Sequence, residues 1–248
     1  MSELSLIHWA LLGLAAAGVG LSKSGLAGVS LLHVLVFAFV FGARASTGIL
    51  LPLLIVGDLC AIWLVGHGVV WAYVRRLLAP TLVGVVIGWW LLDRLDEQAF
   101  RPLIGSIILV LSLGQFLRMR RPDLFANVPH ARWFVLTMGM LAGVTTMLAN
   151  AAGPVVALYL LASALPKTEL IATSAWFFLI LNVSKVPLSM NLGLIDPSTL
   201  AINLILAPAV LLGLLFGRWL VQHIPQRLFD SLLLLFTAIA ALRLIGWV

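Results

Sequence analysis

Charge is scarce in this sequence. Asp, Glu, Lys and Arg together make up 10% of the residues, whereas apolar residues make up 62%. An ordinary soluble domain is about a quarter charged and about half apolar. A chain with so little charge cannot cover a globular surface with polar groups, so lipid must solvate most of its length. This composition excludes a soluble enzyme.

Cysteine and the common catalytic motifs are also missing. The single cysteine, Cys60, lies inside an apolar run, which excludes a disulfide-stabilised secreted domain and a cysteine-based zinc site. The chain has no Gly-x-x-x-x-Gly-Lys-Ser/Thr loop for ATP. It also lacks the Gly-x-Ser-x-Gly and His-Glu-x-x-His signatures that an intramembrane protease would carry. We therefore expect no enzymatic activity, no cofactor and no metal site.

Long hydrophobic segments are what the sequence has instead. A membrane-spanning helix needs ~20 apolar residues, and several runs reach that length. We predict an all-α, polytopic integral membrane protein. The first run lacks a basic leader and a clear cleavage site, so we interpret it as a retained helix and not a signal peptide. The apolar segments are 4–22, 24–42, 46–72, 77–93, 98–117, 133–149, 151–165, 169–191, 198–221 and 227–247.

The second half of the chain repeats the first. Glycine, proline and tryptophan matches are the informative ones, because leucine and alanine matches are common in this composition. They are Gly18/Gly143, Gly28/Gly153, Gly68/Gly193, Pro80/Pro208, Gly84/Gly213, Gly88/Gly217 and Trp90/Trp219. Chance similarity between apolar helices is the alternative. We predict a first membrane repeat over 1–120, a basic linker over 121–132 and a second membrane repeat over 133–248.

Each predicted repeat holds five segments, which fixes the relation between the halves. If all five cross the membrane, or if the first two form a hairpin and three cross, the number of crossings is odd. The second half then enters from the opposite side, as in transporters with inverted repeats. The sequence leaves open which of the two variants holds. We expect broken or hairpin helices at the start of each repeat.

Basic residues give this bundle an orientation. The chain has 15 Lys and Arg against 9 Asp and Glu, a net charge of +6, which in a membrane protein marks cytoplasmic loops and not nucleic-acid binding. Arg75, Arg76, Arg118, Arg120, Arg121, Arg132, Lys167 and Arg227 fall on one side. We therefore predict that the 118–132 loop is cytoplasmic and that both termini lie outside.

Two glycine-rich breaks stand at matching positions, around Gly18–Gly28 and Gly143–Pro154. Glycine lets the backbone leave helical geometry, and irregular backbone at membrane depth survives only where protein or a water-filled cavity satisfies it. A helix that restarts after such a break points free N–H groups into the cavity, which favours an anion. Ordinary tight turns between helices are the alternative.

Charged and polar side chains gather near these breaks. Intramembrane charge is costly and is tolerated mainly when it is paired or faces a cavity. Lys23 and Lys185 are candidates to attract an anion, and Asp58 is a candidate charge partner or carrier of a coupling proton. Arg44 and His33 are more typical of a helix-end residue and of packing. The candidate substrate-binding residues are Ser22, Lys23, Ser24, Gly25, Asn150, Gly153, Pro154, Thr173, Asn182 and Lys185.

The sequence around the breaks resembles the sulfite exporter TauE/SafE family of membrane transporters, from about Leu11 to the C-terminus. The most specific motifs are Ala152-Gly153-Pro154, Ala172-Thr173-Ser174-Ala175, Asn182-x-x-Lys185 and Gly213-x-x-x-Gly217. The first break departs from the family, which often carries a denser glycine run followed by proline where this chain has Ser22-Lys23-Ser24-Gly25. The resemblance implies that the break residues, Asn182 and Lys185 line a substrate path.

The resemblance also implies a function and a location. It indicates a secondary transporter that exports a small sulfur-containing anion, either sulfite or an organosulfonate such as sulfoacetate, by alternating access. The alternative is a non-transporting membrane anchor for an enzyme of sulfur metabolism. The expected partners are the anionic substrate and the lipid bilayer of a bacterial inner membrane, without nucleic acid, and a homodimer stays open.

Overall fold

The computed structural model describes residues 4–24, 26, 29–121, 131–162 and 165–223, and positions 235, 237–239, 241–242, 245 and 246 near the C-terminus. These residues form helices and no strands, as the sequence predicts. The helices within 4–223 are α1 (Leu6–Lys23), α2 (Val29–Phe41), α3 (Ala43–Val65), α4 (Trp71–Arg94), α5 (Glu97–Arg120), α6 (Arg132–Ala149), α7 (Gly153–Ala162), α8 (Lys167–Asn191) and α9 (Pro197–His223). The predicted segment 227–247 lies almost wholly outside the described residues.

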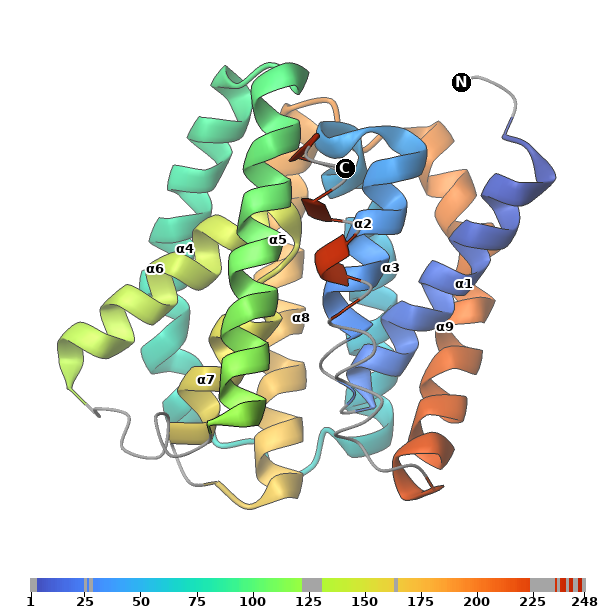
Figure 1. Cartoon of the computed structure of the whole chain (residues 1–248). Helices are drawn as coiled ribbons and strands as arrows, with labels where there is room; N and C mark the ends of the chain where they lie inside the picture. The colour runs from blue at the N-terminus through green and yellow to red at the C-terminus, as the bar shows by residue number, and fades with distance from the viewer. Residues whose placement is uncertain are drawn as a thin grey trace.

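Seven of these helices, all except α2 and α7, are long and apolar enough to cross a membrane. At 1.5 Å per residue, the ten residues of α7 extend ~15 Å, about half of a ~30 Å hydrocarbon core. In Figure 1, α1 and α2 form a hairpin at the end of the bundle that holds the N-terminus, and α6 and α7 form a hairpin at the opposite end. The starts of α2 and α7 lie close together, since a methyl group at Gly153 would lie 3.3 Å from the Ser30 hydroxyl oxygen.

The junction between the third and fourth helices differs from the predicted segment 46–72. Helix α3 ends at Val65 and α4 begins at Trp71, because Gly66 closes the last turn of α3 and Gly68 has a φ of +85°, a conformation that favours glycine. The connecting backbone is held against α8. Trp176 donates from Nε1 to the carbonyl of Gly66 at 3.1 Å, which anchors the loop.

Close helix pairs cross the boundary between the two halves of the chain. Helix α4 packs on α6 and α1 packs on α9, and Figure 1 places the two pairs at opposite sides of the bundle. A methyl group at Gly84 would overlap the carbonyl oxygen of Met140, and one at Gly213 would overlap that of Ala17. Small residues at these positions let the backbones approach.

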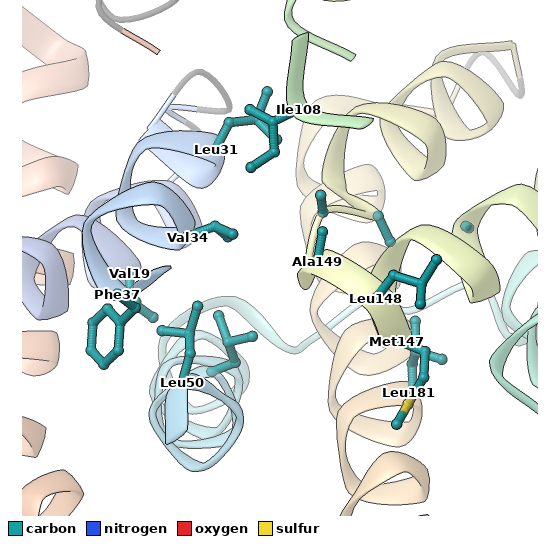
Figure 2. Packing of buried hydrophobic residues seen from close by; sticks show 14 of the residues in the cluster. Val19, Leu31, Val34, Phe37, Leu50, Ile108, Met147, Leu148, Ala149 and Leu181 are labelled. Carbon is teal, nitrogen blue, oxygen red and sulfur yellow. The ribbon is translucent and has the colours of Figure 1, made fainter. Parts of the chain in front are cut away.

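The core between these pairs is apolar and continuous. Figure 2 shows Val19, Phe37 and Leu50 on one side of it and Met147 and Leu181 on the other. All five side chains are buried, and they belong to one cluster. This packing fixes the ends of α1 and α6, where the hairpins turn, against the middle of α3 and α8.

Candidate functional site

A buried ion pair joins the first hairpin to α3. Lys23, in the last turn of α1, places its Nζ 2.6 Å from Oδ1 of Asp58, which lies in the second half of α3. The Asp58 side chain has no exposure, and the Lys23 side chain is 14% exposed. An ion pair without solvent is retained only when both charges are matched, so these two residues hold α1 and α3 in register.

Helix α8 continues this pair into a chain of polar contacts. Asn182 donates from Nδ2 to Oδ2 of Asp58 at 2.7 Å. Its Oδ1 accepts from Nζ of Lys185, one turn further along α8, at 3.4 Å. Asn182 and Lys185 are both buried. The asparagine therefore bridges the carboxylate and the second ammonium group.

The second hairpin completes the cluster. Lys185 donates from Nζ to Oδ1 of Asn150 at 2.6 Å, to Oγ1 of Thr146 at 3.0 Å and to the Thr146 carbonyl at 3.1 Å. An ammonium group has three protons, so these acceptors saturate Lys185. Asn150 ends α6 in the left-handed conformation, with φ 50° and ψ 31°, and its Nδ2 donates to the carbonyl of Thr47 in α3.

A cavity of about 200 Å³ lies beside this cluster. Its polar lining comes from both hairpins and α8, and its apolar lining includes the Phe178 ring, which lies 4.7 Å from Nζ of Lys23. Lys23 lines the cavity, whereas Asp58 and Lys185 lie behind that lining. The residues around the cavity are Ser22, Lys23, Ser30, His33, Leu54, Ala61, Thr146, Asn150, Gly153, Ala157, Leu160, Leu170, Ile171, Ser174, Ala175, Phe178 and Asn182.

The structure brings most of the predicted site residues together. Ser22, Lys23, Asn150, Gly153 and Asn182 line the cavity, and Asp58 and Lys185 bond to that lining. Three predicted residues do not line the cavity. The hydroxyl of Ser24 donates to the carbonyl of Leu21, that of Thr173 accepts from the backbone N–H of Val70, and Pro154 is not among the lining residues. Gly25 lies outside the described residues.

Sequence reasoning missed several residues of this cavity. Thr146 lies inside the second break, so its position was a usable signal. His33, assigned to packing, is 2% exposed and lines the cavity, and its Nδ1 has no hydrogen-bond partner within the described part of the chain. Ser30 and Phe178 carried no signal, because a serine or phenylalanine in an apolar helix is usually structural.

The polar groups of this site suit the binding of a small polar ligand. The described residues contain no group of three His, Cys, Asp or Glu that could hold a metal ion. The cavity offers one ammonium group, two amides and several hydroxyls, which are donors that recognise oxygen atoms of an anion.

Seven membrane-length helices, and a cavity with several polar side chains between the two halves of the described chain, are typical of a multi-pass membrane protein of the transporter class. The family model described as sulfite exporter TauE/SafE matches residues 10–244, so the chain belongs to that family of membrane transporters. This confirms the resemblance that the break motifs indicate. No curated protein and no solved structure matches the chain.

Proposed function

We propose that this protein is a secondary transporter that exports a small sulfur-containing anion, sulfite or an organosulfonate. The observation that carries the proposal is the buried cluster at the meeting point of the two hairpins. It holds Lys23 and Lys185 against the single carboxylate of Asp58, beside a cavity. Buried charge is energetically costly, so we infer that this cluster has a functional role. Its excess of positive charge attracts an anion.

Alternating access follows from where the cavity lies. It is lined from α1, α2 and α3 of the first half and from α6, α7 and α8 of the second half. Movement between these elements exposes a substrate to one side and then to the other. The opposed hairpins and the positive φ at both Gly68 and Gly193 support an inverted repeat.

The close helix pairs limit which parts can move. The close backbone contacts between α4 and α6, and between α1 and α9, leave little room for the two helices of a pair to slide past each other. Each pair therefore moves as one body, although its two helices come from different halves of the chain. Each moving body therefore contains helices from both halves of the chain, and the two sequence halves do not rock against each other as units.

The energy for export needs no nucleotide. An inside-negative membrane potential favours anion exit by ~2.3 kcal/mol per charge per 100 mV. Asp58 is the candidate for coupling to protons, because it is the buried carboxylate that contacts the cavity lysine. Flux with and without a pH gradient decides whether protons take part.

The test is transport by the purified protein. Proteoliposomes loaded with sulfite, sulfoacetate, taurine or thiosulfate are expected to release at least one of the anions faster than protein-free liposomes. The same compounds are expected to raise the thermal unfolding temperature in detergent. The alternative, a membrane anchor for a sulfur enzyme, predicts neither flux nor thermal shifts, and that result would sink the proposal.

A further inference from the structure

We infer that Asp58 sets the charge of the anion that the site accepts, so that the protein selects monovalent over divalent anions. This rests on the proposed function and specifies its substrate class.

The charges around the cavity leave one net positive charge. Among the residues that the structure describes there, α1 contributes Lys23, α3 contributes Asp58 and α8 contributes Lys185. Helix α2 contributes His33, a buried imidazole that is neutral at pH 8. The lining from α6 and α7 is uncharged. Two ammonium groups and one carboxylate therefore make +1.

Each of these charges has the contacts that a buried ion needs. Asp58 accepts from the amide of Asn182 at 2.7 Å and pairs with Lys23 at 2.6 Å. Lys185 has three oxygen acceptors within 3.1 Å. These contacts stabilise the charged forms. These contacts oppose the desolvation that disfavours each buried charge, and we take both lysines and the carboxylate as ionised in the cluster.

Lys23 is the lysine that can meet the anion. Within the described part of the chain its ammonium has one oxygen partner, Oδ1 of Asp58, and it also lies over the Phe178 ring. Two of its three protons are free for a substrate that enters the cavity. Lys185 is saturated and lies behind the lining, so it contributes its charge through space and through Asn150 and Asn182.

A single negative charge on the substrate neutralises the +1 charge of the cluster, whereas a second negative charge exceeds it. A bound monoanion brings the cluster from +1 to zero, whereas a dianion leaves −1 in a buried cavity. An uncompensated buried charge is strongly unfavourable. The apolar wall adds to this preference, because Leu160, Leu170 and Phe178 face a ligand's organic part and offer nothing to a second anionic group.

Ethanesulfonate and sulfoacetate form a matched pair for the test. They share the sulfonate and have similar length, but a methyl group in the first replaces a carboxylate in the second. Isothermal titration of the purified protein at pH 8 is expected to show ethanesulfonate binding more than about tenfold tighter. Asp58→Asn raises the cluster charge to +2, and we expect it to bind sulfoacetate in preference.

Two further variants show whether the ligand preference follows the net charge of the cluster or the loss of one contact. Lys185→Gln keeps a hydrogen-bond donor but lowers the cluster charge to zero, so it should weaken both ligands and sulfoacetate more. The double variant Asp58→Asn with Lys185→Gln restores +1 and should restore the preference for ethanesulfonate. Size-exclusion profiles and thermal unfolding identify the variants that fold, and any one folded variant with its expected preference supports the inference.

The outcomes distinguish this inference from the proposed function. Equal binding of the two ligands by the wild type, a wild-type preference for sulfoacetate, or an Asp58→Asn variant with unchanged preference would overturn the inference and leave an anion transporter in place. A wild type that binds and transports neither compound nor sulfite would overturn both.

Discussion

At the scale of single residues, Lys23 and Lys185 have different roles although both are charges in apolar sequence. Lys185 gives its protons to Thr146 and Asn150 and holds the end of α6 against α8. Lys23 keeps free protons and lines the cavity. Donor satisfaction, and not charge alone, decides which lysine can contact a substrate.

Removing the Lys23 ammonium should therefore impair binding and stability together. We expect Lys23→Ala to weaken sulfite binding by about tenfold or more, because a charged contact is lost. It should also lower the free energy of unfolding by on the order of 3 kcal/mol, since Asp58 stays buried without its partner. Titration calorimetry and chemical unfolding measure the two effects. Arg101→Ala, an exposed charge removed far from the cluster, is the control, and wild-type affinity in Lys23→Ala would remove Lys23 from the site.

A second residue-scale prediction concerns Asp196, which begins α9 outside the membrane-spanning segments. The Ser198 hydroxyl and the backbone N–H of Thr199 hold the pKa of the Asp196 carboxyl below its ordinary value. A lowered pKa means that this cap stabilises the fold above the ordinary carboxyl range and is lost as pH falls through the lowered value.

Asp196→Ala should accordingly lower the unfolding temperature modestly at pH 7. The difference from wild type should shrink as the pH falls below the ordinary carboxyl range and the wild-type carboxyl becomes protonated. Differential scanning fluorimetry across this pH range measures it. A difference that stays constant with pH would contradict the role of the ionised carboxylate.

At the scale of elements, the close helix pairs depend on glycine having no side chain at the contact. A methyl group at Gly143 on α6 would overlap the carbonyl oxygen of Thr81 on α4, whereas one at Gly114 on α5 would meet nothing within 4 Å. The same chemical change is thus expected to have opposite effects at the two positions.

Gly143→Ala should destabilise the protein by about 1–3 kcal/mol through overpacking against α4. Gly114→Ala should be neutral or stabilise by up to about 1 kcal/mol, because alanine favours the helix. Unfolding in a denaturant series, with expression yield as a second readout, compares the two variants. Equal stability of both would contradict the close approach of α4 and α6.

At the scale of the whole molecule, charge and topology together give an orientation. Basic residues lie at the α3–α4 and α5–α6 ends, whereas acidic Asp93, Asp96 and Glu97 lie with the α4–α5 loop at the other end. We predict that the first end is cytoplasmic. Both hairpins then open to opposite sides of the membrane.

Cysteine labelling in intact cells tests this orientation. In a Cys60→Ala background, Gln98→Cys, in the first turn of α5, should react with a membrane-impermeant maleimide, and His67→Cys in the α3–α4 loop should react only after permeabilisation. Both positions are exposed. The reverse labelling pattern would place the 118–132 loop outside.

Much of the fold was readable from local sequence. Apolar runs identified the helices, and the predicted ends at 133–149 and 198–221 differ from α6 and α9 by two residues or fewer. The error at 46–72 arose because Trp71 continues the apolar run, whereas Gly66 and Gly68 end α3. Hydropathy does not detect a break that glycine makes inside apolar sequence.

The candidate site was readable only in part, because charge in apolar sequence is conspicuous and neutral lining is not. Lys23, Asp58 and Lys185 stood out as rare intramembrane charges. Thr173 was chosen by its motif, yet its hydroxyl bonds to the Val70 backbone. Ser30, Thr146 and Phe178 became visible only where the helices converge.

The sequence by itself determined the solvent, the class of fold and the charged residues that matter. Composition and segment length act locally and need no partner. Only the tertiary structure decided that Lys23 pairs with Asp58, that Asn182 bridges Asp58 to Lys185, and that α1 and α6 end at one cavity. These contacts join residues from different helices and, between Asn182 and Asp58, from opposite halves of the chain, and the packing of α1 on α9 and α4 on α6 brings them within reach.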